Sequence, residues 1–459
     1  MFNPESTWWP HPDKQLESLF VRGETTQLLA GLRHPRVAAD PYARLRILDR
    51  LHRMNPDDEP IRAAWIQAML LGNRPHVVWP ETKTWPTTTT TATDLGLLLL
   101  AAQVAQALGE TDEARQRYSD LLQEFPSSVD VWQKYIEFEE PERLPADTSS
   151  QLERLRSSTN SRYEREKIGF SLARYWQFRH PGSAFLFACE AHKLKRLRAG
   201  KFDSFAKAKR LNADRQWKPQ TFAPGSPPTP IFVVGLPRSG TTLLSSILAG
   251  HDKISNAGEQ TLIPSLAAGP CRSAGAPDIR LSEFIQAWYR AAVGDLARDA
   301  IAVVDKLPAN AESCGLILAM FPNALIVHIE RNLADCAISI HMHDFELGCS
   351  YADDVTDLVD YTNMVSNHLR HWHSQAPDRI FRIRFEDLVT NPESVLEPLL
   401  TTLKLAWDPA MLDFWKRKDK IATYSERQVR RPLNRSGIDR WRKFLPEAMP
   451  FFNALGVST

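Results

Sequence analysis

Apolar residues follow a helical spacing along the first part of the chain and form short continuous runs in the second part. Up to about residue 215 they recur every three or four positions, which predicts helices. Residues 217–230, WKPQTFAPGSPPTP, contain five prolines and cannot continue a helix. We therefore predict an all-α domain over residues 1–216, a proline-rich linker over 217–230 and a second domain over 231–459.

The second domain alternates strand-length apolar runs with helical segments. Four runs, IFVVG, IAVVD, ALIVHI and RIFRIRF, have the length and composition of buried strands. This alternation is typical of an α/β fold with a mainly parallel sheet covered by helices on both faces. Ligands of such sheets collect at the carboxyl ends of the strands, so we expect the functional site there.

The first domain contains one segment with the spacing of a known helical repeat. In residues 94–126 a helix is predicted to end at Leu108, and a second helix is predicted to stop before Pro126. The second helix has the spacing of the second half of a tetratricopeptide repeat. Looser echoes occur in LRILDRLHRMNPDDEPIRAAWIQAML and IGFSLARYWQFRHPGSAFLFACEAHKLKR. We predict a tetratricopeptide-like helical domain, with an ordinary helical bundle as the alternative.

Composition limits which classes of binding partner the protein can have and in which cellular compartment it is expected. The 459 residues are 43% apolar and 24% charged, with 56 Lys and Arg against 55 Asp and Glu, so no global field attracts nucleic acid or an anionic membrane. The cysteines are scattered without a zinc-like spacing. MFNPESTWWPHPDK resembles no signal peptide, and no apolar stretch is long enough to span a bilayer. We expect a cytoplasmic protein without a membrane or nucleic-acid partner; the oligomeric state is not indicated.

The stretch IFVVGLPRSGTTLL at residues 231–244 predicts an anion-binding loop. Its frame has the spacing of a nucleotide P-loop, GxxxxGK[ST], but Thr241 stands in place of the lysine. A strand that ends at Gly235 and a helix that begins near Gly240 would present backbone N–H groups to an oxyanion. The residues expected to contact this anion are Arg238, Ser239, Gly240, Thr241 and Thr242.

Two ligands fit a loop of this kind. A nucleoside triphosphate would be held with Mg²⁺, and Asp305 at the end of IAVVD imitates the aspartate that binds this ion. A kinase or ATPase without the loop lysine would lack a central charge stabiliser. In this chain the positive charge lies at Arg238, which favours a different donor.

The loop and the sequence around it resemble the sulfotransferases that use 3′-phosphoadenylyl sulfate (PAPS). VGLPRSGTTLLSSIL is similar to the loop of protein-tyrosine sulfotransferases and of bacterial sulfotransferases with N-terminal tetratricopeptide repeats, and the likeness covers most of residues 231–446. The resemblance implies a P-loop-like, mainly parallel sheet, PAPS as donor, 3′,5′-adenosine bisphosphate (PAP) as product and no required metal.

Two further motifs carry the same resemblance. In residues 324–345 it implies that Arg331 and Ser339 hold the 3′-phosphate. Residues 424–441 resemble the segment that covers the nucleotide, in which Gln428, Val429, Arg430 and Arg440 are the expected contacts. The chain departs from the tyrosine enzymes at His343, where they have a second phosphate-binding arginine, and at Phe385, where they have a tyrosine.

The chemistry needs a base for the acceptor and positive charge where the leaving phosphate develops. The resemblance implies Glu259 as the base, Lys306 as the bridging cation and Ser425 as a further transition-state hydroxyl. Surface or structural roles for Glu259 and Lys306 are the alternatives. The His368, His371 and His373 cluster lacks a carboxylate to complete a metal site, and a partly solvated helix explains it better.

The acceptor is the least determined part of the prediction. Helical-repeat domains usually present a concave surface to a peptide, and together with the resemblance this favours a tyrosine of a peptide or protein. A phenol, sugar or amine of low molecular mass is the alternative acceptor. A repeat scaffold whose α/β domain has lost turnover is the non-enzymatic alternative.

Overall fold

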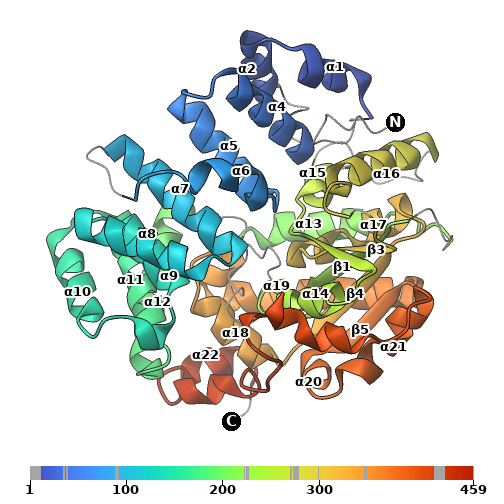
Figure 1. Cartoon of the computed structure of the whole chain (residues 1–459). Coiled ribbons are helices and arrows are strands. Elements are labelled where there is room, and N and C mark those ends of the chain that lie inside the picture. The colour runs from blue at the N-terminus through green and yellow to red at the C-terminus, as the bar shows by residue number, and fades with distance from the viewer. Residues whose placement is uncertain are drawn as a thin grey trace.

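A computed structural model describes residues 12–34, 37, 40–87, 92–221, 223, 227–268, 271, 279–297, 299–345, 349–417 and 429–457. The first half of this chain is helical and the second half contains a sheet flanked by helices (Figure 1). Among the helices described, none combines the length and the apolar character that a bilayer crossing requires.

Helices account for the regular structure before the sheet. Several of them begin at a side-chain cap, and at α4 (Pro41–Met54) a proline follows the cap: an Asp40 oxygen accepts from the Ala43 N–H at 2.9 Å. The others are α1 (Lys14–Arg22), α2 (Thr25–Arg33), α5 (Glu59–Leu71), α6 (Pro75–Thr82), α7 (Ala92–Leu108), α8 (Thr111–Glu124), α9 (Val129–Phe138), η1 (Pro141–Arg143), α10 (Thr148–Ser158), α11 (Arg162–Trp176), α12 (Pro181–Ala199) and α13 (Ser204–Asp214).

The predicted repeat segment forms a helical pair. Helix α7 ends at Leu108 and α8 ends before Pro126, as predicted. Ala114 is fully buried in the contact between the two helices, together with Ala102 and Ala105, because small side chains let helices approach closely. The two looser echoes fall on the pairs α4–α5 and α11–α12.

The second half contains a five-stranded sheet in which every recorded pairing is parallel. The prediction of a parallel sheet is confirmed, with strand order β2-β3-β1-β4-β5. Strand β1 begins at Thr229, inside the predicted linker. The strands are β1 (Thr229–Gly235), β2 (Ile254–Gly258), β3 (Ala302–Asp305), β4 (Leu325–Glu330) and β5 (Ile380–Arg384).

The sequence analysis missed β2. Its five residues, ISNAG, contain two polar side chains, and the strand lies at the sheet edge, where one side needs no neighbouring strand. An apolar run is therefore not required at this position, so a search for such runs does not detect it.

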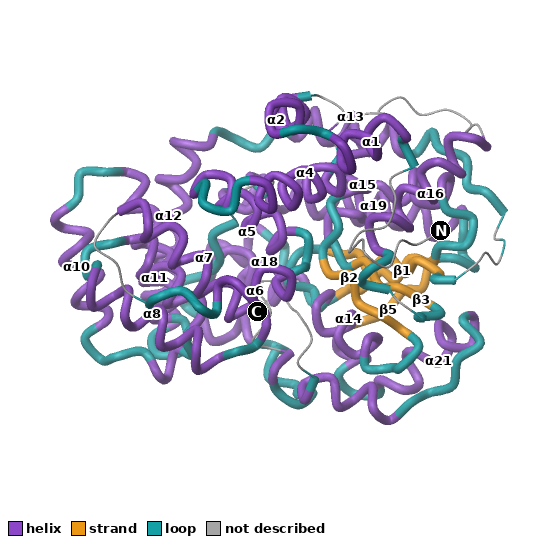
Figure 2. Tube along the Cα trace, turned by 45° about the horizontal axis from the view of Figure 1, so that its top comes forward, coloured by secondary structure: helices purple, strands orange, loops and turns teal. Residues whose placement is uncertain are grey.

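Alternating strand residues face two separate apolar layers. In β1, Phe232 and Val234 belong to one cluster, whereas Ile231 and Val233 belong to another. Figure 2 shows α14 and α21 on one side of the strands and α16 and α19 on the other. The flanking elements are α14 (Thr241–Ala249), α15 (Leu262–Ala268), α16 (Ile279–Val293), η2 (Pro308–Ser313), α17 (Cys314–Met320), α18 (Leu333–His341), η3 (Ser350–Asp353), α19 (Val355–Gln375), α20 (Phe385–Leu388), α21 (Pro392–Thr402), η4 (Pro409–Lys416), η6 (Arg440–Phe444) and α22 (Met449–Ala454).

The helical part packs directly against the sheet part. The larger apolar cluster is a single group of contacting side chains. Its members come from both parts of the chain, for example Tyr42 from the helical part and Phe452 from the sheet part. The fully buried Arg74 makes a bidentate ion pair with Asp295, at 2.6 and 2.8 Å. These contacts fix the cleft between the two parts.

His368, one of the three clustered histidines, has a structural role at this junction. His368 is fully buried and its Nε2 lies 3.0 Å from an Asp214 oxygen. The same carboxylate accepts from the backbone N–H groups of Gly315 and Leu316. The interpretation as a partly solvated helix is wrong for His368, because a buried aspartate from the helical part supplies its partner.

Candidate active site

The predicted site residues follow directly after the strands, at one edge of the sheet. Strand β1 lies in the centre between β3 and β4. The chain passes from β1 to β2 on one side and from β3 to β4 on the other, and this switch of direction opens a crevice at the carboxyl ends. The residues that directly follow β2, β3, β4 and β5 are Glu259, Lys306, Arg331 and Phe385.

The loop after β1 depends on glycine at Gly240. This residue has φ 106° and caps α14, a backbone conformation that side chains disfavour. A Cβ atom there would lie 2.6 Å from Cδ2 of Phe385. Glycine is therefore required both for the turn and for the close approach of β5.

The loop hydroxyls form a buried polar surface around the helix start. Ser239, Thr241 and Thr242 are all buried, and the Ser239 hydroxyl has no hydrogen-bond partner among the described residues. A buried orphan hydroxyl beside a helix N-terminus fits an oxyanion, which would accept its hydrogen bond.

Arginine side chains converge on this loop. Arg238 donates from Nε to the Ser339 hydroxyl at 3.0 Å. Arg331 donates to the Arg238 carbonyl at 3.0 Å and to the Gly437 carbonyl. Glu330, the residue before Arg331, pairs with Arg382 at 2.7 Å and does not engage Arg331.

The arginines form a concentrated positive charge. Burial, together with the neighbouring Arg174, Arg440 and Arg331, lowers the pKa of Arg238 to about 9. Burial likewise lowers the pKa of Arg440 to about 10. Several like charges held close together favour binding of a multiply charged anion.

Glu259 and Lys306 meet at the mouth of the loop. The Lys306 ammonium donates to the Glu259 carboxylate in an ion pair whose lysine is 3% exposed and whose glutamate is 38% exposed. Lys306 also donates its backbone N–H to the Gly258 carbonyl at 2.8 Å. Asn310 is buried and its amide makes no hydrogen bond within the described chain, so no such bond orients Lys306.

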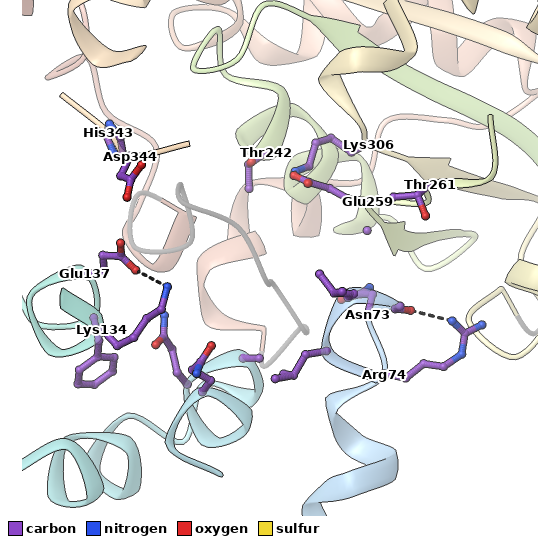
Figure 3. Close-up of a pocket in the computed structure, with 18 of the residues that line it drawn as sticks. Asn73, Arg74, Lys134, Glu137, Thr242, Glu259, Thr261, Lys306, His343 and Asp344 are labelled. Atoms are coloured by element: carbon purple, nitrogen blue, oxygen red, sulfur yellow. Dashed lines mark hydrogen bonds and ion pairs between the residues drawn. The ribbon is translucent and has the colours of Figure 1, made fainter. Parts of the chain in front are cut away.

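A cavity of about 940 Å³ opens beside this ion pair. In Figure 3, Glu259 and Lys306 point toward one another next to Thr242. The residues labelled around the cavity come from both parts of the chain: Asn73, Arg74, Lys134 and Glu137 from the helical part, and Thr242, Glu259, Thr261, Lys306, His343 and Asp344 from the sheet part.

Asp305 does not reach this cavity. It is fully buried, and neither carboxylate oxygen makes a hydrogen bond of ordinary geometry among the described residues. Burial outweighs the nearby Gln260 N–H and Tyr289 hydroxyl and raises the pKa of Asp305 to about 8. A buried neutral acid is a poor candidate for the Mg²⁺-binding aspartate of an ATPase, so this alternative loses its main support.

Asp305→Asn is expected to stabilise the protein at neutral pH. The pKa of Asp305 is raised above its unfolded value of 3.8, so the folded state loses stability as the pH rises from about 4 to 8. This loss reaches about 4 kcal/mol at pH 7, since each pKa unit corresponds to about 1.4 kcal/mol. Asparagine cannot ionise and avoids the loss. Urea unfolding at pH 5 and pH 8 should show an advantage of the variant that grows with pH; a disadvantage that grows with pH would mean an ionised Asp305.

The C-terminal segment is held on the helical part. Val429 is buried in the apolar cluster beside α14, and the Arg430 guanidinium packs against Gly109. Arg431 pairs with Glu140 at 2.6 Å. The predicted residues Ser425 and Gln428 lie outside the described residues.

Arg440 is positioned by the end of helix α11. It donates to the Gln177 side-chain oxygen at 2.8 Å and lies 4.8 Å from the centre of the Phe178 ring. Backbone N–H groups of Asp439 and Trp441 donate to Asp335 at 2.9 Å. Helices α11 and α18 therefore hold this arginine near Arg238 from two sides.

The two departures from the tyrosine enzymes have different consequences. Phe385 is buried, and the Arg331 guanidinium stacks 4.4 Å from its ring centre, so the aromatic contact is retained without the hydroxyl. Burial lowers the pKa of His343 well below its usual range, and Arg238 and Arg174 lower it further. His343 donates from Nδ1 to the Ser339 carbonyl at 2.6 Å and is neutral at pH 7.

Sequence reasoning missed the contribution of the helical part. Arg174 in α11 lines the cavity and interacts electrostatically with Arg238 and Arg440. Asn73 packs against Gly258, the residue before Glu259. No local pattern marks either residue, because their roles come from tertiary packing across the cleft.

The lysine-free loop, the strand-end residues and the arginine cluster lie in an α/β domain with a parallel sheet, and residues of the helical part line the adjoining cavity. A family model described as "Sulfotransferase family" matches residues 230–409. A second model, "Tetratricopeptide repeat", matches residues 95–138. The predicted resemblance to the sulfotransferases is thereby confirmed over residues 230–409.

Relatives with similar sequences support the same class. An uncharacterized protein of Aquifex aeolicus is 29% identical over 402 residues, which are 79% of this chain and 50% of that protein. Protein-tyrosine sulfotransferase 1 of Danio rerio is 26% identical over 47% of this chain and 66% of its own length. The human protein of the same name is 27% identical over 47% of this chain and 64% of its own. The chain thus spans between half and two thirds of these relatives.

Solved sulfotransferase domains show a loose structural likeness. The domain from the curacin biosynthetic pathway has 19% identity and a TM-score of 0.35, covering 51% of this chain and 99% of its own. The domain from the Synechococcus olefin synthase has 19% identity and a TM-score of 0.37, covering 53% of this chain and all of its own.

Proposed function

We propose that the protein transfers a sulfuryl group from PAPS to an acceptor hydroxyl, most favourably a tyrosine of a peptide or protein. The observation that carries this proposal is the arginine cluster around a P-loop without lysine, with the Glu259–Lys306 pair at its mouth. The sulfotransferase-family match over residues 230–409 agrees with it.

The described residues fit a donor that carries two separated anionic groups. The loop with the orphan Ser239 hydroxyl suits the 5′-phosphosulfate, and Arg331, Arg238 and Ser339 suit the 3′-phosphate. Both predicted roles rest on the resemblance together with this geometry. Among the described residues, no three side chains of the metal-ligating types are grouped.

The proposed transfer is a single displacement. The acceptor oxygen forms its bond to sulfur while the bond from sulfur to the bridging phosphate oxygen breaks. The acceptor proton passes to the Glu259 carboxylate, and the electron pair of the broken bond leaves with PAP. Lys306 lies beside Glu259, where its charge can stabilise the departing phosphate.

The helical part supports a peptide acceptor, because it forms one wall of the cavity that reaches Glu259. A phenol, sugar or amine of low molecular mass is the second candidate acceptor. A cytoplasmic location belongs to this proposal as well, since all five cysteines are free thiols.

Calorimetric titration with PAP and with ATP, each with and without Mg²⁺, tests the donor. Metal-independent binding of PAP in preference to ATP is expected. Mg²⁺-dependent preference for ATP would instead establish a nucleoside triphosphatase or kinase. Sulfate transfer to tyrosyl peptides and to phenols then identifies the acceptor class, and PAP binding without any transfer would favour the scaffold alternative.

Arg331→Ala is expected to remove the preference for a 3′-phosphate. A hydrogen bond to a charged group contributes about 1.5 to 3 kcal/mol, so PAP affinity should fall about 10- to 100-fold while affinity for 5′-AMP stays nearly constant. Calorimetry on both ligands measures the ratio. Equal weakening of both ligands would place the 3′ site elsewhere, and Arg331→Lys separates loss of charge from loss of the planar donor pair.

A further inference from the structure

The α/β domain supplies fewer cations to its phosphate helix than the resemblance implies. His343 lies four residues after Ser339, just past the end of α18. The buried, neutral His343 uses Nδ1 on the Ser339 carbonyl. One positive charge is therefore absent at this position of the domain.

Arg174 of the helical part lines the same cavity as His343. It belongs to α11, and it lines the cavity together with Thr242 and His343. Its electrostatic effect reaches His343, Arg238 and Arg440, which requires proximity to all three. Arg174 is thus a member of the arginine cluster although it comes from a different domain.

The Arg174 side chain has capacity to bind an anion. Its Nε is buried and makes no hydrogen bond among the described residues. The carboxylates that act on it are Glu137 and Glu142, and Glu137 pairs with Lys134 at 3.1 Å. No ion pair to Arg174 is formed within the described chain.

The end of α11 contributes to the cluster a second time. Gln177, which follows the helix, accepts from Arg440 at 2.8 Å and donates to the Arg174 carbonyl at 3.2 Å. The same helix end therefore carries one cation and orients another. This arrangement makes the helical part a component of the donor site.

We propose that Arg174 supplies the cation missing at His343, so that the helical domain completes the 3′-phosphate site of the donor. The inference rests on the proposed PAPS-dependent function and extends it. Donor binding then depends on how the two domains are docked, and the helical domain does more than present an acceptor.

Calorimetry with PAP and 5′-AMP on the full-length chain tests this role. Arg174→Ala should weaken PAP binding about 10- to 100-fold and change 5′-AMP binding less than about twofold. Arg162→Ala on the same helix is the matched control, because Arg162 is exposed at its first position, and should leave both affinities unchanged. Unchanged PAP affinity in Arg174→Ala, with a raised acceptor KM, would assign Arg174 to the acceptor and overturn the proposal.

Relocating the charge gives a second test. His343→Arg in the Arg174→Ala background should recover most of the lost PAP affinity, since it returns a cation to the same anion from the other domain. If circular dichroism shows that the double variant is folded but its PAP affinity does not recover, residues 174 and 343 do not serve the same phosphate, and the proposal is contradicted. If Arg174→Ala does not fold, Arg174→Gln replaces it in both measurements. If the unchanged protein does not bind PAP, the proposed function fails, whereas PAP binding insensitive to residue 174 overturns only this inference.

Discussion

Replacing Glu259 by glutamine is expected to lower kcat about 10²- to 10⁴-fold, the usual contribution of a general base. An ordinary glutamate has a pKa of about 4.3 and a tyrosine about 10, so forming free phenolate first would cost roughly 8 kcal/mol. Proton removal must therefore accompany attack, which requires a carboxylate within reach of the acceptor. Glu259 is partly exposed to the cavity beside Lys306, which meets this requirement.

The affinity for PAP separates a base from a binding residue. Glu259→Gln should bind PAP within about twofold of the unchanged protein, because the amide has nearly the same shape. Glu393→Gln, an exposed position at the start of α21, is the control and should leave kcat unchanged. Normal turnover with weakened PAP binding in Glu259→Gln would remove this residue from the role of base.

Strand ends could be predicted because burial on both faces demands continuous apolar runs. IFVVG and ALIVHI identify β1 and β4 with errors of one or two residues, and the residues that follow them become site candidates by topology alone. The edge strand β2 follows no such rule. Glu259, which follows β2, was found only through the family resemblance, not through the recognition of its strand.

Residues that act across the domain boundary carry no comparable signal. Arg174 is one of several arginines on helices, and its spacing within α11 does not distinguish it from the exposed Arg162. The neutral state of His343 is likewise a consequence of burial and of neighbouring arginines. Sequence indicates which residue replaced the family's arginine but not which residue compensates for it.

Tertiary structure also explains why Asp305 resembles a metal ligand in the sequence but does not reach the cavity. In the sequence, Asp305 ends an apolar run as a Walker-type aspartate does. In an extended strand, successive side chains point in opposite directions, so Lys306 lines the cavity while Asp305 is buried beneath the sheet edge. A shift of one residue along the strand would exchange which of the two side chains faces the cavity, and the sequence alone does not show which one does.

Replacing Lys306 by methionine is expected to lower kcat about 10²- to 10³-fold, comparable to loss of one preorganised donor in an oxyanion site. Methionine keeps the length and apolar stem of a side chain that is 3% exposed but has no charge. The loss should appear in kcat more than in PAP affinity, because the charge on the leaving phosphate grows as the bond to sulfur breaks. Lys253→Met, at a half-exposed lysine just before β2, is the matched control.

The ion pair makes the double variant more informative than either single variant. If Glu259 and Lys306 act as one unit, Glu259→Gln combined with Lys306→Met should lower kcat little more than the worse single change. Losses that multiply would instead mean that the two side chains act independently and that their contact is incidental. Lys306→Arg discriminates further, since a guanidinium retains the charge but not the compact ammonium geometry. Recovery of turnover in Lys306→Arg would show that charge alone suffices, and a loss as large as in Lys306→Met would show that the position of the charge relative to Glu259 is what the reaction requires.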